Sequence, residues 1–223
     1  ADVPVGLQLL ERTSALREEA WDTLAESLHS EPEGELAQEM QWLFDSIGLH
    51  NTRSLLENFL NKRAEWWAYT QGQQDAVAWA LDELRSALEV DEADDPLATL
   101  VDKDFDLTVQ AFASLLQSGS EAQQKMARAL DTARMLEDVQ ARFDALFEVL
   151  HTGKGEPRKL KANKGQNAEH YANLLEGIFD VLHHIQDELA ERTALRLNQA
   201  GLRCGVALLA HYQQLKLQQQ VMD

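Results

Sequence analysis

Apolar residues recur along most of this chain at steps of three and four positions, and no stretch alternates strictly between apolar and polar residues over six or more positions. A step of three to four residues places apolar side chains on one face of an α-helix, whereas a step of two indicates a half-buried strand. The pattern therefore predicts an all-α protein without strands. We expect an irregular multi-helix bundle with a long C-terminal helix.

Four helices are predicted before residue 91, with approximate ranges 12–29, 35–48, 51–72 and 74–90. The first stops at the segment 30–34, which contains Pro32 and Gly34, and the second stops at Gly48. Asn51 is predicted to cap the third helix, because its side chain can accept a hydrogen bond from an unpaired N–H of the first turn. The acidic segment DEADDP, residues 91–96, predicts a break or a linker.

Two or three shorter helices are predicted after the break, and then one long helix. Ser120 and Gln123 have the spacing of a capping box, in which each side chain satisfies a backbone donor. Asn167 is predicted to cap a run that stays compatible with a helix almost to the end, for more than about fifty residues or roughly 75 Å. Such a helix usually extends beyond a compact body or bends at a weak point such as Gly201 or Gly205. We expect one helical domain over 1–223, with two lobes separated near 91–96 as the alternative.

The composition is that of a folded protein, with 44% hydrophobic and 26% charged residues in 223 positions. No run approaches the ~18 consecutive apolar residues that cross a bilayer, and the first fourteen residues, ADVPVGLQLLERTS, lack the basic and apolar regions of a secretory signal. We therefore expect a cytoplasmic protein with no membrane partner. The single cysteine, Cys204, lies among apolar residues of a predicted helix and is expected to be a buried, inert thiol.

One basic segment stands out in an otherwise acidic chain. The formal net charge is -18, from 38 acidic and 20 basic residues, which disfavours non-specific binding of nucleic acid by the whole molecule. The segment HTGKGEPRKLKANKGQ, residues 151–166, nevertheless carries five cations against the single acid Glu156. The candidate contacts to nucleic acid are Lys154, Arg158, Lys159, Lys161 and Lys164.

Phosphate is the ligand that this loop suits best. Lysine and arginine side chains bind phosphate oxygens, and backbone N–H groups freed by Gly153 and Gly155 can add to the site. The alternative is a mobile loop whose charge balances nearby acids.

Metal chemistry has weaker signals. Three acid-x-x-histidine pairs have the spacing that places both side chains on one helical face, as di-iron bundles require. They are Glu26 with His29, Glu148 with His151, and Asp180 with His183. About one such pair is expected by chance, and the further inward carboxylates that a di-metal site needs do not stand out. A di-metal bundle is thus the less favoured alternative, and the neighbours His183 and His184 are expected to be one core-edge and one solvated imidazole.

Nucleotide chemistry within the chain is not supported. No phosphate-loop motif, nucleophile elbow or paired cysteine motif occurs, and Gly153-Lys154-Gly155 lacks the upstream glycine and the downstream Ser or Thr of a phosphate loop. No cofactor is therefore expected in this chain. Trp66, Trp67 and Trp79 lie on helices beside leucines, so packing is expected in preference to base stacking.

Four stretches together resemble landmarks of the UvrD/RecB-type superfamily 1 DNA helicases, specifically the large AddA- and RecB-like helicase-nucleases. They are ADVPVGLQLLE (1–11), LLENFLNKRAEWW (55–67), LFEVLHTGKGEPRKL (146–160) and HYQQLKLQQQVMD (211–223). Gly155 to Lys159 resembles the G-E-P-R-K stretch of that family, which precedes a long helix. Tyr212 and Lys216 resemble its Y-x-x-x-K pair, which leads toward the Walker B acids.

The resemblance implies that the chain is an interior piece, the all-helical 1B subdomain inserted within the first RecA-like domain. It implies no catalytic residues here, and ATP and Mg for the parent helicase, together with a possible exonuclease activity. The implied partners are DNA, held weakly and locally, the other domains of the parent, and a second subunit. A docking module within the same complex, using exposed leucines of the terminal helix, is the alternative function.

Overall fold

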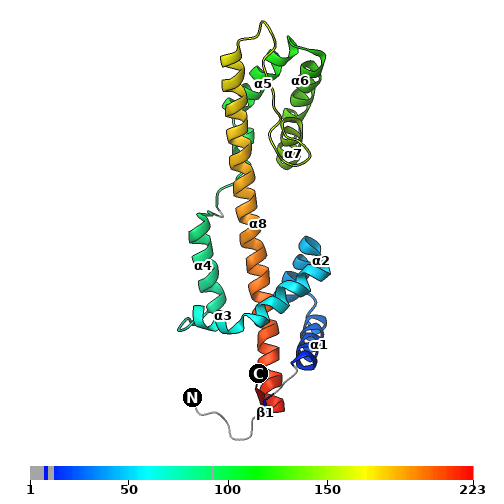
Figure 1. The fold of residues 1–223 in the computed structure, drawn as a ribbon, viewed down its shortest axis with the longest axis vertical. Coiled ribbons are helices and arrows are strands. Elements are labelled where there is room, and N and C mark those ends of the chain that lie inside the picture. The colour runs from blue at the N-terminus through cyan, green and yellow to red at the C-terminus, as the bar shows by residue number, and fades with distance from the viewer. Residues whose placement is uncertain (1–7, 10–12, 92, 223) are drawn as a thin grey trace. The chain divides into compact units, whose positions relative to one another are not determined.

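The computed structural model describes residues 8–9, 13–91 and 93–222, and it is all-α apart from one short strand pair (Figure 1). The chain divides into two compact units. Unit 1 comprises residues 1–89 and 193–223, and unit 2 comprises residues 90–192. The first boundary falls beside the acidic segment 91–96. The second falls inside the C-terminal helix, where nothing in the sequence indicated it.

The long helix predicted after Asn167 is present as α8, Ala168–Gln219, with 52 residues. Asn167 caps it as predicted, because its Oδ1 accepts hydrogen bonds from the backbone N–H groups of Glu169 and His170, both at 3.1 Å. Residues 168–192 of α8 belong to unit 2 and residues 193–219 to unit 1.

Unit 1 packs helices α1 (Ser14–Ser30) and α2 (Glu35–Asn61) against the C-terminal part of α8. Helices α3 (Arg63–Tyr69) and α4 (Ala76–Leu88) complete it. Its core includes Leu16, Leu24, Leu43, Leu56, Cys204, Leu208 and Tyr212. Cys204 is fully buried, so its expected burial is confirmed, and burial raises the pKa of its thiol to about 12.

The helix end predicted at Gly48 is present as a break in α2, which consists of two helical segments that meet at this residue. Gly48 has φ +79° and ψ 159°, which a residue with a Cβ adopts only under strain. The prediction that Asn51 is an N-cap is wrong. Its Nδ2 donates to the carbonyl of Ile47 at 2.8 Å, and the hydroxyl of Thr52 donates to that of Gly48 at 2.9 Å. Both side chains thus satisfy carbonyls beside the kink, and the chain continues as helix to Asn61.

A buried carboxylate joins α2 to α8 within unit 1. Glu39 is only 4% exposed and is paired with Arg196 and Arg203 of α8. The Arg203 Nη1 to Glu39 Oε1 distance is 2.8 Å. A buried charge is tolerated when it is paired and hydrogen-bonded, so removing either partner would leave an uncompensated charge in the interior.

A two-residue parallel strand pair also lies in unit 1 and was not expected from the sequence. Strand β1, Gln8–Leu9, pairs with β2, Val221–Met222, in the register Gln8 with Val221 and Leu9 with Met222. The rest of the N-terminal stretch that resembles the helicase family, residues 1–7 and 10–11, lies outside the described residues.

Unit 2 contains the short 3₁₀ helix η1 (Ala98–Val101) and helices α5 (Lys103–Gln117), α6 (Glu121–Arg134) and α7 (Val139–Leu150). They enclose a core with the first part of α8 that includes Val109, Phe112, Leu116, Leu130, Leu146, Ile178, Leu182 and Ile185. Half of the predicted capping box is present. Ser120 accepts from the N–H of Gln123 at 3.4 Å, but the Gln123 side chain bonds elsewhere, to the carbonyl of Lys161.

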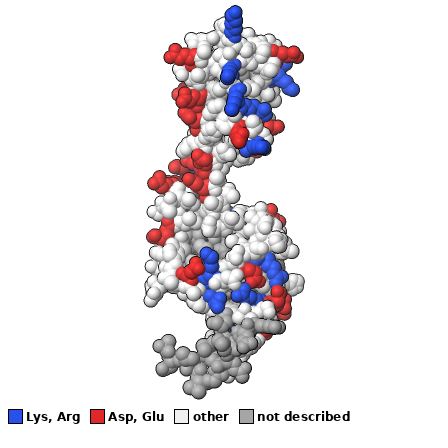
Figure 2. All heavy atoms as spheres, in the orientation of Figure 1, with Lys and Arg blue, Asp and Glu red and all other residues white. Residues whose placement is uncertain are grey.

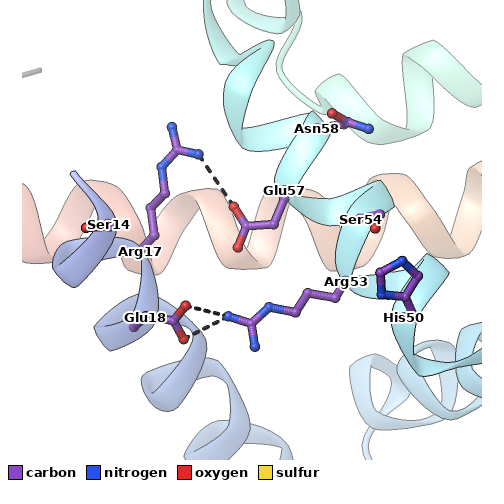
Figure 3. A pocket seen from close by; sticks show the side chains of 8 residues that line it. All are labelled: Ser14, Arg17, Glu18, His50, Arg53, Ser54, Glu57 and Asn58. Carbon is purple, nitrogen blue, oxygen red and sulfur yellow. Dashed lines mark hydrogen bonds and ion pairs between the residues drawn. The ribbon is translucent and has the colours of Figure 1, made fainter. Parts of the chain in front are cut away.

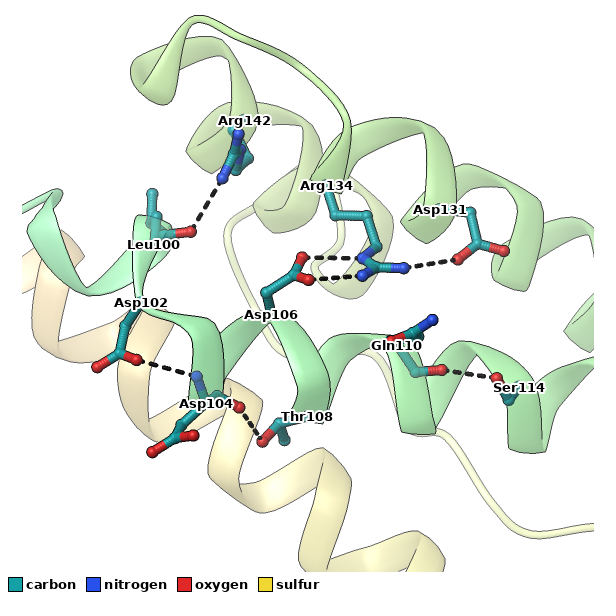
Figure 4. A network of polar contacts seen from close by, with 10 residues as sticks. All are labelled: Leu100, Asp102, Asp104, Asp106, Thr108, Gln110, Ser114, Asp131, Arg134 and Arg142. Carbon is teal, nitrogen blue, oxygen red and sulfur yellow. Dashed lines mark hydrogen bonds and ion pairs between the residues drawn. The ribbon is translucent and has the colours of Figure 1, made fainter.

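Two arginines tie the helices of unit 2 together (Figure 4). Arg134 of α6 donates two hydrogen bonds to the carboxylate of Asp106 on α5, at 2.9 and 2.6 Å. These bonds lower the pKa of Asp106. Arg142 of α7 donates to the carbonyls of Leu100 and Leu136, at 3.1 and 2.6 Å. The fixed donors of a guanidinium suit this bridging role.

The glycines of α8 near residue 200 allow α2 to approach closely. A Cβ added at Gly205 would lie 2.8 Å from two ring carbons of Phe59, whereas one added at Gly201 would meet only a methyl of Leu55, at 3.3 Å. The bare backbone of Gly205 is therefore required by packing.

We predict that Gly205→Ala lowers the free energy of unfolding of unit 1 by about 1–2 kcal/mol, because the clash with Phe59 outweighs the helix propensity gained. Gly201→Ala is the matched control and should be at least as stable as wild type, by up to about 1 kcal/mol, since the Leu55 methyl can move and helix propensity is gained. All five tryptophans lie in unit 1, so urea unfolding followed by tryptophan fluorescence reports on this unit alone. Equal stability of the two variants would contradict the packing role.

Candidate nucleic-acid interface

The basic loop begins in a closed turn at the end of α7. Thr152 N–H donates to the carbonyl of Glu156 at 2.8 Å, and Gly155 N–H donates to the carbonyl of Thr152 at 2.9 Å. Gly155 has φ +77°, a conformation that favours glycine. An isolated bridge between His151 and Pro157, and the bond from Arg158 N–H to the carbonyl of Leu150, hold the two sides of the turn together.

This turn corrects one part of the phosphate hypothesis. Gly155 was expected to leave its N–H free for phosphate, but that group is used inside the turn. The N–H groups of Lys154 and Glu156 are also engaged, by the hydroxyl of Thr152 at 3.4 and 3.3 Å. Of the two glycine N–H groups expected to bind phosphate, that of Gly155 is therefore already engaged, and the exposed lysine and arginine side chains are the main donors that the loop offers to an anion.

The second half of the loop is fastened to unit 2 by amide side chains. Gln123 donates to the carbonyl of Lys161 at 3.0 Å and accepts from Asn163 Nδ2 at 2.6 Å. Gln166 donates to the carbonyl of Leu115 at 2.8 Å and accepts from Asn163 N–H at 2.7 Å. The two contacts of Gln123 and the contact of Gln166 with Leu115 were not foreseen from the sequence. Each of these three joins residues that are 38 to 51 positions apart.

The inward and outward residues of this segment alternate. Leu160 and Ala162 pack against the core of unit 2, whereas Lys159 and Lys161 are exposed. In an extended segment successive side chains point to opposite sides. The apolar residues thus anchor the segment, and the anchoring turns the lysines outward.

All five candidate cations are exposed, and none of them pairs with a carboxylate of the described residues. Arg158 makes one long hydrogen bond, 3.4 Å, from Nη2 to the carbonyl of Glu148. Figure 2 shows Lys and Arg side chains gathered over the part of unit 2 that carries this loop in Figure 1. Charge balance by nearby acids, the alternative explanation, therefore has no ion pair to support it here.

A polar cleft in unit 1 differs from the loop in that its cations are paired with carboxylates (Figure 3). It also holds two arginines, but each faces a carboxylate. Arg53 donates to both oxygens of Glu18, at 2.6 and 2.7 Å, and Arg17 lies 3.5 Å from Glu57. The cations of this cleft are neutralised internally, so the loop of unit 2 is the better site for an external anion.

The imidazole of His151, the first residue of the basic loop, contacts that of His183 on α8. The Nε2 atoms of His151 and His183 are 3.0 Å apart, and Nδ1 of His151 lies 3.1 Å from the carbonyl of Phe147. A carbonyl only accepts, so Nδ1 carries a hydrogen and Nε2 of neutral His151 accepts from His183. Phe147 stacks on His151, and Phe179 stacks on His183. His183 is half-buried and His184 exposed, as expected, but nothing in the sequence pointed to the contact with His151.

The three acid-histidine pairs do not form a metal site in the structure. Two of them converge through the imidazoles of His151 and His183, but their carboxylates, Glu148 and Asp180, are both exposed. Glu26 and His29 are exposed in unit 1. In the described part of the chain, no group of three or more His, Cys, Asp or Glu side chains is placed to hold a metal ion.

The aromatic and family-like residues of unit 1 have mixed environments. Trp66 and Trp79 are half-buried, in line with the packing that was expected, whereas Trp67 is 46% exposed. Tyr212 is buried, and Lys216 Nζ lies 5.7 Å from the centroid of its ring. The pair that resembles Y-x-x-x-K thus contributes to packing within unit 1.

Comparison of the chain with models of known families, with curated proteins and with solved structures gives no match. Among the described residues, no helix combines the length and the apolar character that crossing a bilayer requires.

Burial lowers the pKa of His151 below the usual 6.5, and the nearby His183 and Arg158 act in the same direction, against the hydrogen bond to Phe147. The unfolded chain therefore takes up a proton at this histidine at higher pH than the folded chain does. We predict that unit 2 loses stability as the pH falls below about 6.5, and that the loss levels off below the folded pKa.

The measurement is an NMR titration of the His151 imidazole, with thermal unfolding of wild type and His151→Phe followed by circular dichroism between pH 7.5 and 5. Only the wild type should show the loss of thermal stability below about pH 6.5 that protonation of His151 in the unfolded chain causes. A pKa of His151 at or above 6.5, or equal pH dependence in both proteins, would contradict the assignment.

Proposed function

We propose that this chain is a non-catalytic helical domain of an ATP-dependent DNA helicase or helicase-nuclease, and that it contacts DNA beside the motor through the loop 151–166. The observation that carries the proposal is the cluster of five exposed cations, unpaired among the described residues, on a loop fastened to its own helical unit. The resemblance to UvrD/RecB-type helicases supplies the context. ATP and Mg belong to the motor of the parent.

Electrostatics favours a local and weak contact. Lysine and arginine side chains that neutralise phosphates release condensed counterions, and this attraction does not depend on base sequence. The net charge of -18 opposes close approach of DNA elsewhere on the molecule. The proposed contact is therefore confined to the loop and positions DNA without reading its sequence.

The strand pair in unit 1 is compatible with an inserted domain. A domain inserted into another must receive the chain and return it at neighbouring points. Gln8 and Leu9 lie beside Val221 and Met222 in a parallel pair, which meets this requirement. Parallel pairs occur mostly within larger covered sheets, and two residues per strand are too few for an independent sheet.

We predict that the 223-residue chain binds forked or duplex DNA weakly at about 20 mM salt, and that changing Lys154, Arg158, Lys159, Lys161 and Lys164 to Ala abolishes binding. Fluorescence anisotropy of a labelled fork measures the affinity. The slope of log K against log salt should become shallower by up to about 0.9 for each phosphate contact that a substitution removes.

A matched pair of triple variants tests whether binding depends on the cations of the loop or on positive charge anywhere in unit 2. Lys154→Ala, Lys159→Ala and Lys161→Ala should weaken binding by at least tenfold. The control changes Lys103, Lys125 and Arg128, three exposed cations of unit 2 outside the loop, to Ala and should change it less than threefold. Absence of wild-type binding at low salt, together with no effect of the loop changes in the full-length helicase, would refute the DNA contact.

The placement within a helicase has its own test. The open reading frame should encode a Walker A motif upstream of these residues and an aspartate-rich Walker B motif shortly downstream. A gene that lacks both motifs would exclude a helicase parent, even if the chain binds DNA.

A further inference from the structure

An apolar groove runs between α1 and α2 in unit 1. Its floor is formed by Leu24 and Met40, which are 0% and 2% exposed, and the hollow has a volume of about 270 Å³. The other lining residues are Trp21, Ala25, Leu28, Phe44, Leu49 and Arg53. The groove continues past Leu28, Met40 and Phe44 into a second hollow that reaches Pro32 and Trp42. Seven of the eight side chains around the first hollow are apolar.

The groove is held open by polar contacts at one end. Arg53 of α2 donates to both oxygens of Glu18 on α1 (Figure 3). Trp21 Nε1 donates to Glu57 at 2.6 Å. The guanidinium of Arg53 also lies 5.5 Å from the centroid of the Trp21 ring. These contacts fix the two helices side by side, so a ligand would find the groove already formed.

One apolar side chain stands at the rim without cover from the described residues. Leu49 is 70% exposed and directly follows the kink at Gly48. A single exposed leucine is ordinary, but this one adjoins a continuous apolar surface. Exposed apolar surface that is contiguous and edged by polar residues is typical of an interaction site.

The charge at the edges of the groove selects the partner. Four exposed or half-buried carboxylates lie beside the groove. Glu18, Asp22 and Glu57 lie near its lining residue Arg53, and Asp45 lines the second hollow. The two arginines beside them, Arg17 and Arg53, already face Glu57 and Glu18. Glu18, Glu57 and Asp22 all act on Arg53 and raise its pKa. Negative charge is thus in excess, which disfavours nucleic acid and favours a cationic partner.

We propose that this groove binds an amphipathic helix of a partner protein, with apolar side chains at helical spacing in the groove and Lys or Arg along its flanks. Docking of the apolar face of a helix into a hydrophobic groove is a common mode of peptide recognition. The acidic edges supply orientation and attraction, and the apolar floor supplies most of the affinity. The site is separate from the basic loop and does not depend on the proposed DNA contact.

The test uses the full 223-residue chain and two synthetic helical peptides of about 18 residues, roughly 27 Å long. Both peptides carry the same leucine stripe. One has lysine and the other glutamate at the remaining positions. Fluorescence anisotropy of the labelled peptides should give a dissociation constant for the lysine peptide at least tenfold lower than that for the glutamate peptide.

Two groove variants separate docking from general attraction to an acidic protein. Leu49→Asp and Ala25→Glu act on exposed lining residues and add negative charge. They should weaken binding of the lysine peptide by at least tenfold, although charge alone would strengthen it. Leu217→Asp is the matched control, because Leu217 is 73% exposed and lies on α8 outside the groove. It should change the affinity less than twofold, as should the five changes in the basic loop.

Three outcomes would overturn the proposal. The first is equal loss of affinity in Leu49→Asp and Leu217→Asp, and the second is equal affinity for the two peptides. The third is a wild-type dimer in sedimentation analysis that Leu49→Asp converts to a monomer, because the groove would then be occupied by a second copy of the chain.

Discussion

One helix completes the core of both units, and the rest of the fold depends on this sharing. Ile178, Leu182 and Ile185 of α8 are fully buried in unit 2, whereas Cys204 and Leu208 of the same helix are fully buried in unit 1. Helices that pack into either unit must therefore fit a surface of α8. In unit 1 the fit relies on Gly205, where the ring of Phe59 takes the space of a side chain. In unit 2 it relies on large apolar residues at helical spacing, which is the ordinary arrangement for a core helix.

Carboxylates outnumber cations in this chain, so the partners of each cation become informative. Three arginines that join helices face a carboxylate, since Arg134 faces Asp106, Arg196 faces Glu39 and Arg53 faces Glu18. Such pairs contribute geometry and orientation more than net stability, particularly where they are exposed. The cations of the loop 151–166 depart from this pattern because they have abundant acids in the same protein and no ion pair among the described residues. The resulting surface suits an external polyanion, and the acidic edges of the α1–α2 groove suit the opposite charge.

The sequence was sufficient for features that depend on neighbouring residues. Helical periodicity predicted the all-α fold and the long α8, and the local hydrogen bonds of Asn167 and Ser120 were predicted from spacing alone. Features that depend on distant residues were missed. Gln123 had the spacing to complete a capping box but bonds to Lys161, and His151 meets His183 because α7 and α8 pack together. Asn51 failed as a cap because helix resumes directly after the break at Gly48, which leaves Asn51 inside the first turn of the second segment of α2. The cations of the basic loop were identified from composition, whereas their exposure and anchoring required the structure.

The contacts that fasten the second half of the loop are neutral, and this matters for how the loop responds to its surroundings. Gln123, Asn163 and Gln166 hold it through carboxamide groups, which neither titrate nor lose their bonds to mobile ions. Rising ionic strength therefore weakens the electrostatic attraction between the lysines and a polyanion without releasing the loop segment that carries them. The loop behaves as a fixed array of charges. The ionic strength of the solvent sets the distance over which they act, and the protein sets the spacing between them.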